Sequence, residues 1–279
     1  MKLLLNNLYI VSTPIGNLDD ITLRALDVLK KSDIILCEDT RRSIKLLNHF
    51  KIKKKLISYH KFNEKKKLVE IIKYFNEGKI LSLISDAGTP LLSDPGRILV
   101  NECINNEIKV VPIPGASSIT SALSISGFND QFLFYGFLPK TENELEKVLT
   151  SLSENIYTQI FFAPANKINL YIKKFKKFYR GRKILIAKEI TKVHEFFFRD
   201  EIEQVKEFKK PIKGEITIVI SEKNLKIKYF NKEKIVSKIK KYLKKYSLKD
   251  TVDLILETEK INKKKIYDLC LKIKNEKNN

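Results

Sequence analysis

Short apolar runs alternate with helix-like segments through the first half of the chain, and this alternation limits the folds open to it. The segment at 20–31 shows the helical pattern, with Leu23, Leu26 and Leu29 behind an Asp. Strands that alternate with helices need crossover connections, so we expect a mostly parallel sheet covered on both faces. The six runs that indicate strands span 8–13, 33–39, 55–60, 79–85, 109–113 and 132–137.

A polar stretch with Gly and Pro, "GFLPKTENE" at 136–144, is the expected joint between two domains. Beyond it the pattern predicts a second α/β domain with a mixed sheet, including a short helix after residue 200. Three amphipathic helices follow residue 222. The predicted fold class is therefore α/β, with two α/β domains, a cleft between them and a small C-terminal helical segment. The predicted domains are 1–137, 138–222 and a basic helical tail at 223–279.

Positive charge is concentrated in the second half of the chain. Residues 1–138 hold 19 Lys and Arg against 14 Asp and Glu, whereas residues 139–279 hold 35 against 19. A basic half suits a polyanion such as RNA. Codon bias of an AT-rich genome would also enrich Lys, and the helical tail fits a solvated surface bundle as well as an RNA contact.

Several classes of site are excluded by spacing. No two of the nine Gly lie closer than eight residues, which removes the G-x-G-x-x-G and Walker loops. The three His share no metal-ligand spacing, so we expect no metal. Three widely separated Cys favour a reducing cytoplasm, and no apolar stretch reaches the roughly 18 residues of a membrane span. We therefore expect a cytoplasmic protein.

Three turn-rich loops each follow a predicted strand. They read "STPIGNLDD" at 12–20, "SDAGTPLLSDPG" at 85–96 and "PIPGASS" at 112–118. Ligands of open α/β sheets bind at the carboxyl ends of the strands, so three such loops predict one cleft. The alternative is that they are ordinary turns with Asp caps.

These loops, together with "EDTR" at 38–41 and "KEITKVHEFFFR" at 188–199, resemble the ribosomal RNA small-subunit methyltransferase I family of the tetrapyrrole-methylase superfamily. The resemblance implies S-adenosylmethionine (SAM) as methyl donor and a homodimer of two-domain subunits. It implies methyl transfer to the ribose 2′-OH of a cytidine in the decoding region of 16S rRNA (cytidine 1402). The SAM-binding residues carried over are Pro14, Gly16, Asp86, Ala87, Gly88, Thr89, Pro114, Gly115, Ala116 and Ser117.

A ribose hydroxyl is a weak nucleophile, so a positioned base is expected near the methyl donor. The catalytic candidates are Glu38, Asp39, Arg41, Lys188 and Glu189, with no single base assigned. Tyr59 with His60, and "EFFFR" at 195–199, offer aromatic rings for RNA bases, unless these rings pack in the core.

One stretch departs from the family pattern. Where the family usually has a sequence like "FYESPHR", this chain has "FFAPANK", so Ala163 and Lys167 replace a Glu and an Arg. Two other functions stay open on sequence alone. One is methylation of a tetrapyrrole or corrinoid small molecule, and the other is RNA or ribosome binding without catalysis.

Overall fold

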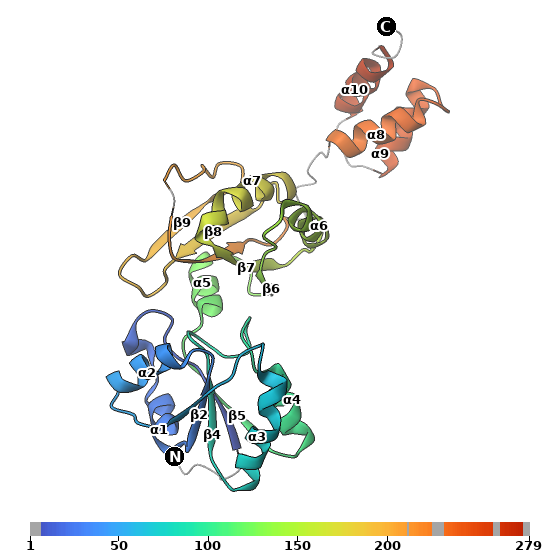
Figure 1. Cartoon of the computed structure of the whole chain (residues 1–279). Coiled ribbons are helices and arrows are strands. Elements are labelled where there is room, and N and C mark those ends of the chain that lie inside the picture. The colour runs from blue at the N-terminus through green and yellow to red at the C-terminus, as the bar shows by residue number, and fades with distance from the viewer. Residues whose placement is uncertain (1–6, 211, 225–231, 259–262, 276–279) are drawn as a thin grey trace. The chain divides into compact units, whose positions relative to one another are not determined.

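The computed structural model describes residues 7–210, 212–224, 232–258 and 263–275 (Figure 1). The chain divides into two compact units, residues 1–223 and 224–279. The first unit contains two five-stranded sheets and the second contains helices. Within the described residues, no helix is both long enough and apolar enough to cross a bilayer.

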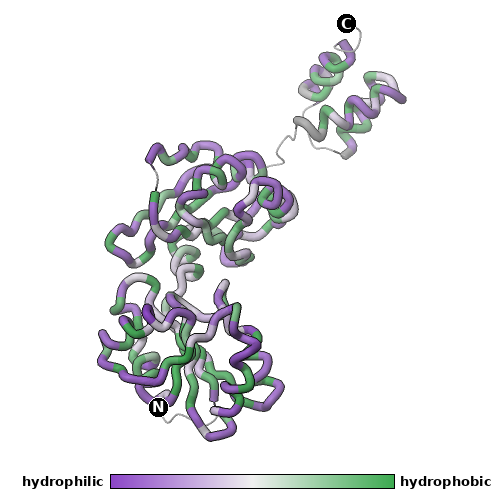
Figure 2. Tube along the Cα trace, viewed as in Figure 1, coloured by the Kyte–Doolittle hydropathy of each residue, from purple (hydrophilic) through white to green (hydrophobic). Residues whose placement is uncertain are grey.

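The first sheet is parallel throughout, as the alternation predicts, in the order β3-β2-β4-β1-β5. Successive side chains of a strand point to opposite faces, so Leu8 and Tyr9 enter two different cores. Figure 2 shows these apolar strands enclosed by helices of more polar sequence. The strands are β1 (Asn7–Val11), β2 (Ile34–Cys37), β3 (Lys55–Ser58), β4 (Leu81–Ile84) and β5 (Lys109–Ile113).

Two pairs of helices cover the first sheet. One core holds Val28 of the first helix and Leu47 of the second, and the other holds Ile71 and Leu99 of the next two. The predicted covering of both faces is therefore confirmed. These helices are α1 (Leu23–Lys31), α2 (Thr40–His49), α3 (Glu64–Asn76) and α4 (Arg97–Asn105), with a 3-10 turn η1 (Leu18–Asp20) before α1.

The second sheet is mixed, as predicted, in the order β6-β7-β10-β8-β9 with only β6 and β7 parallel. The strand at 132–137, expected to close the first domain, pairs with β7 in this sheet instead. The domain boundaries themselves stay a prediction. The strands are β6 (Phe132–Phe137), β7 (Thr158–Pro164), β8 (Lys183–Lys188), β9 (Phe196–Glu201) and β10 (Glu215–Ile220).

Helices also cover both faces of the second sheet. Two of them, α6 (Glu142–Ser153) and α7 (Ile168–Phe178), pack on one face, and η2 (Ala165–Lys167) leads into α7. On the other face α5 (Ser118–Ser126) packs through Ile119 and Ala122 in a core that also contains Ile15 of the first loop. The short helix predicted after residue 200 is wrong, since the described residues between β9 and β10 form turns and extended chain.

The second unit has a hydrophobic core of its own. Its three helices are α8 (Lys232–Tyr242), α9 (Leu248–Thr258) and α10 (Lys263–Asn275), close to the predicted spans. Ile239, Ile255 and Ile266 are fully buried between them. Ser247 caps α9, because its Oγ accepts a hydrogen bond of 3.2 Å from Asp250 N.

Candidate active site

The loops that follow β1, β4 and β5 are bonded together at one edge of the first sheet. Thr13 and Gly88 exchange backbone hydrogen bonds of 2.9 and 3.0 Å. The Ser12 and Thr89 hydroxyls lie 2.9 Å apart, and Thr89 Oγ1 donates to Ala116 O at 3.3 Å. The prediction that three distant loops share one edge is therefore confirmed.

Glycine is required where these loops touch. Gly88 has a φ of +79°, a region that side chains with a Cβ disfavour. A Cβ on Gly115 would lie 2.9 Å from Ser12 Cβ, which is closer than Cβ atoms approach in proteins. The close approach of the loops thus depends on the absence of side chains at both positions.

A cavity of about 630 Å³ opens beside the joined loops. The volume lies in the range of about 300–1,000 Å³ typical of small-molecule sites. One wall is the polar loop Asp86–Thr89, and Ile119 and Ala187 contribute apolar surface. The opposite wall comes from the second sheet, through residues 162–166 at the end of β7 and 212–217 at the start of β10.

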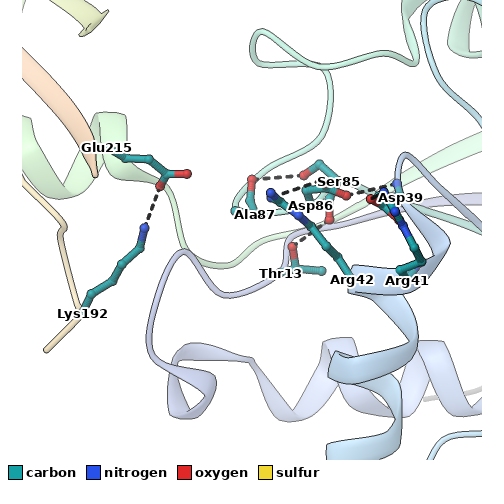
Figure 3. A network of polar contacts seen from close by, with 9 residues as sticks. All are labelled: Thr13, Asp39, Arg41, Arg42, Ser85, Asp86, Ala87, Lys192 and Glu215. Atoms are coloured by element: carbon teal, nitrogen blue, oxygen red, sulfur yellow. Dashed lines mark hydrogen bonds and ion pairs between the residues drawn. The ribbon is translucent and has the colours of Figure 1, made fainter. Parts of the chain in front are cut away.

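Asp86 ties the loop after β4 to the loop after β2 (Figure 3). Its Oδ1 accepts a hydrogen bond of 3.1 Å from Asp39 N, and its Oδ2 lies 3.3 Å from Arg42 Nη1. Thr13 Oγ1 donates to Ser85 O at 3.2 Å, so the first loop joins the same network. One carboxylate at the cavity edge therefore positions two loops.

Asp39 is committed to local structure. It accepts hydrogen bonds from Arg41 N (2.9 Å), Nε (3.0 Å) and Nη2 (2.7 Å), and it is the N-cap of α2. The hydrogen bonds from the Arg41 side chain and backbone lower the pKa of Asp39 to about 2. A carboxylate held in this way is a poor proton acceptor near neutral pH.

Two other carboxyl groups close to Asp86 are harder to ionise. Burial, followed by the charge of Asp86, raises the pKa of Glu38. Burial also raises the pKa of Asp94 to about 6, with the charges of Glu38 and Asp86 adding to it and a hydrogen bond with Ser85 opposing it. Both groups can therefore gain or lose a proton closer to neutrality than an exposed carboxylate.

The loop after β8 reaches the first loop from the second sheet. Asn17 N donates a hydrogen bond of 3.1 Å to Thr191 Oγ1, and a Cβ on Gly16 would overlap Lys192. Thr191 has a φ of 65° and Glu189 one of 53°, both unusual for residues with a Cβ. The chain is therefore held under local strain where the two sheets meet.

Charged contacts hold that strained loop. Glu189 Oε1 accepts hydrogen bonds from Glu215 N at 2.8 Å and from Lys192 Nζ at 3.0 Å. Lys192 Nζ also lies 3.0 Å from Glu215 Oε2, the ion pair drawn in Figure 3. Burial favours a higher pKa for Glu189, but the Glu215 N–H and Lys192 outweigh it and the pKa is lowered. Burial likewise favours a lower pKa for Lys192, yet its two carboxylate partners raise it.

Comparisons with known proteins support one family. The family model for Tetrapyrrole (Corrin/Porphyrin) Methylases matches residues 7–206. The chain is 44% identical over 233 residues to the ribosomal RNA small subunit methyltransferase I of Mesomycoplasma conjunctivae, covering 83% of this chain and 98% of the relative. It is 42% identical over 272 residues to the protein of that name from Buchnera aphidicola, covering 95% and 96%.

The chain belongs to the tetrapyrrole methylase family, in its ribosomal RNA small subunit methyltransferase I branch. Membership makes it a SAM-dependent methyltransferase. Solved structures agree in fold. The methyltransferase CobJ matches with a TM-score of 0.58 at 15% identity, covering 77% of this chain and 94% of that one. A Thermus thermophilus uroporphyrin-III C-methyltransferase complexed with S-adenyl homocysteine matches with a TM-score of 0.53 at 15% identity, covering 77% and 97%.

The cavity of this methyltransferase fits the chemistry of SAM, which combines charged groups with an apolar nucleoside face. The polar loop Asp86–Thr89 forms one wall, and Phe162 and Ile216 provide apolar surface on the other. Asp86 offers a carboxylate to a cationic ligand. Among the described residues, no group of three or more His, Cys, Asp or Glu side chains is placed to hold a metal ion.

The residues predicted to bind SAM divide into two sets. Asp86, Ala87, Gly88, Thr89 and Ser117 line the cavity. The others do not line it: Gly115 and Ala116 hold the loops together, and Gly16 lies against the loop after β8. Pro14 and Pro114 are also outside the lining, in the first and third loops.

The second-sheet wall of the cavity was missing from the predicted site. Ala163, noted only as a departure from the family pattern, lies in that wall and is 2% exposed. The unusual stretch "FFAPANK" was the available signal. Arg42 and Asp94 line the cavity as well. No sequence pattern pointed to Arg42, because its place in the site depends on an ion pair with Asp86, a residue 44 positions away.

Burial shows which of the aromatic residues considered for RNA contact are available to a ligand. Tyr59 is fully buried, so its ring cannot stack on a base. Phe197 and Phe198 pack against the cores on the two faces of the second sheet. Core packing is therefore the correct interpretation for these three, while Phe196 remains 47% exposed.

Proposed function

We propose that this methyltransferase transfers the SAM methyl group to the ribose 2′-OH of a cytidine in the decoding region of 16S rRNA (cytidine 1402). Relatives that share 34% to 44% identity carry the name ribosomal RNA small subunit methyltransferase I. A net charge of +21 suits a polyanionic substrate. The observation that carries the proposal is the cavity formed where three loops of one sheet edge face the second sheet.

The cavity residues divide the binding of SAM between them. The polar residues Asp86 and Thr89 would face its polar end, and Ile119 and Phe162 would cover the nucleoside. When bound, SAM supplies an electrophilic methyl carbon on a sulfonium sulfur. The protein then has to hold the ribose oxygen near that carbon, and such positioning is worth about 7–11 kcal/mol in well-oriented reactions.

Among the predicted candidates, Glu38 is the carboxylate best suited to accept a proton, and it lines a second hollow that shares Asp86 with the cavity. Its carboxylate has no hydrogen-bond or ion-pair partner among the described residues, whereas Asp39 is paired with Arg41 and Glu189 with Lys192. Its pKa is raised by burial and by Asp86. We assign Glu38 the role of accepting the ribose hydroxyl proton.

Methyl incorporation tests the substrate directly. Purified protein with radiolabelled SAM is incubated with small ribosomal subunits, free 16S rRNA or a porphyrin precursor, and the modified ribose is mapped by alkaline cleavage. We expect incorporation at one cytidine of the rRNA. Incorporation into the porphyrin alone would favour the small-molecule methylase, and failure of calorimetric SAM binding would favour a non-catalytic RNA binder.

Glu38→Gln separates the base from the binding site. We expect the rate of methyl transfer at saturating substrates to fall by about 10²–10⁴-fold, with the SAM dissociation constant unchanged. A fall of less than about threefold would remove Glu38 from this role.

We also propose a homodimer that acts in the cytoplasm. β6 is the end strand of the second sheet, and an unpaired strand edge is a place where another chain can pair. Phe132 and Tyr135 of this strand are exposed. Light scattering of the full chain tests the dimer, and cell fractionation tests the location.

A further inference from the structure

Phe62 is an apolar side chain that the fold holds in solvent. It is 81% exposed in a turn braced from both sides. Asn63 Oδ1 accepts from His60 N at 2.8 Å and Asn63 Nδ2 donates to Ser58 O at 3.0 Å, while Phe62 N donates to His60 Nδ1 at 3.3 Å. The turn is thus fixed independently of the ring, so the ring is free to serve a ligand.

Lys side chains without acidic partners in the part of the chain that the structure describes lie on both sides of Phe62 in the sequence. Lys61 Nζ lies 4.8 Å from the Phe62 ring centroid. Lys65 and Lys66, in the first turn of α3, are exposed and have no acidic partner among the described residues. The acidic residue of that turn, Glu64, faces inward and accepts a hydrogen bond of 2.9 Å from Gly96 N. The turn and the start of α3 therefore carry Lys side chains without acidic partners, within the described ranges, close in sequence to an exposed aromatic ring.

The ring borders a hollow of about 430 Å³ that adjoins the SAM cavity. Asp86 lines both spaces, so a group in the hollow lies next to a group in the cavity. The hollow is lined by Glu38, Asp39, Thr40, Arg41, Ser58, His60, Lys61, Phe62 and Asp86.

We propose that this hollow holds an unpaired nucleobase of single-stranded RNA, stacked on Phe62, beside the nucleotide that is methylated. Single-stranded RNA is recognised by bases stacked on aromatic rings and by cations along the phosphates, and the turn at 60–63 supplies both. Lys61 borders the hollow, and Lys65 and Lys66 at the start of α3 add positive charge that would attract the phosphates of the bound strand. The assignment of the ligand as RNA rests on the proposed function. The new element is the place on the protein where the RNA strand enters the site.

Binding of a fluorescent single-stranded RNA covering the methylated region tests the proposal without requiring catalysis. Because one stacked base contributes about 1–3 kcal/mol, Phe62→Ala should weaken RNA binding about 5- to 150-fold. Phe62→Trp should restore it, and SAM affinity should stay unchanged. Val69→Ala is the matched control, since Val69 is also 81% exposed, lies on α3 just after this turn, and borders neither space.

The charge component has its own control. Lys61→Gln should weaken RNA binding and reduce its salt dependence, whereas Lys79→Gln, beyond the other end of α3, should change neither. Equal affinity of wild type and Phe62→Ala for RNA, or no affinity in either, would overturn the proposal. The incorporation assay tests the proposed function separately. If the wild type methylates rRNA and Phe62→Ala binds RNA as tightly as the wild type, the proposed function stands and the stacking site is ruled out.

Discussion

The carboxylate side chains near the loops of this enzyme fall into two groups, one held in structural contacts and one able to exchange protons. Asp39 and Glu189, predicted as catalytic candidates, are bound by Arg41 and by Lys192, and both have lowered pKa values. Glu38 and Asp94 have raised pKa values because they are buried near other carboxylates. The environment of each carboxylate, more than its place in a motif, separates a structural group from a group that can exchange protons.

Gly88 and Gly127 make a matched pair for testing the loop junction. Both have positive φ, +79° and +71°, but a Cβ on Gly127 meets nothing within 4 Å, whereas a Cβ on Gly88 would lie 3.2 Å from Ile15 Cγ2 in the cavity wall. Replacing either with Ala should cost about 1–2 kcal/mol of unfolding free energy. Only Gly88→Ala should also weaken SAM binding, by about tenfold or more in calorimetry. Equal SAM affinity in the two variants would mean that the loop tolerates a side chain.

The raised pKa of Asp94 predicts a pH-dependent stability. The folded protein holds this proton up to about pH 6, while the unfolded chain releases it near pH 4. Stability from this group is therefore present below about pH 4 and is lost as pH rises through 6. In urea unfolding at pH 7, the free energy of unfolding of Asp94→Asn should exceed that of the wild type by about 1–2 kcal/mol. This difference should shrink towards pH 4. A difference that does not depend on pH would contradict the shifted pKa.

Elements of the second sheet complete a site that begins on the first. The ends of β7 and β10 form the far wall of the cavity, and the loop after β8 contacts Asn17 in the first loop. Packing of α5 on β8 and β10 joins the two sheets through Ile119 and Ala122. The site is therefore assembled from strand ends of both sheets within one compact unit.

Glu189→Gln tests whether the strained loop after β8 is structural. The amide can still accept from Glu215 N, but the attraction to Lys192 is lost, so unfolding free energy at pH 7 should fall by about 1 kcal/mol. Because the pKa of Glu189 is lowered in the folded state, this loss should disappear as pH falls through that pKa. The rate of methyl transfer should change less than tenfold. A loss of 100-fold or more would restore Glu189 as the base.

At the scale of the whole molecule, the helical segment is a separate folding unit. Its helices pack around a hydrophobic core of their own. Residues 224–279 contain 17 Lys against 7 Asp and Glu, a net charge of +10. Charge of this size acts on a polyanion over a Debye length of about 8–10 Å.

A variant that ends at Lys223 should keep the melting temperature and SAM affinity of the first unit. Its affinity for rRNA should fall, and the slope of log Kd against log salt should decrease by at least about 1, as expected when phosphate contacts are lost. Anisotropy titrations between 50 and 200 mM salt measure both. An unchanged slope would indicate that the helical segment does not contact RNA.

Local patterns in the sequence determined the parallel sheet, most element spans and the meeting of three loops. Parallel strands place their carboxyl ends at one edge of a sheet. The order of strands and loops was therefore sufficient to predict that the loop with Gly88 and Thr89 meets the other two loops. Tertiary structure alone decided that β6 joins the second sheet, that Arg42 pairs with Asp86, and that Ala163 lines the cavity. Each of these depends on contacts between segments far apart in the chain, whose energy no local pattern records.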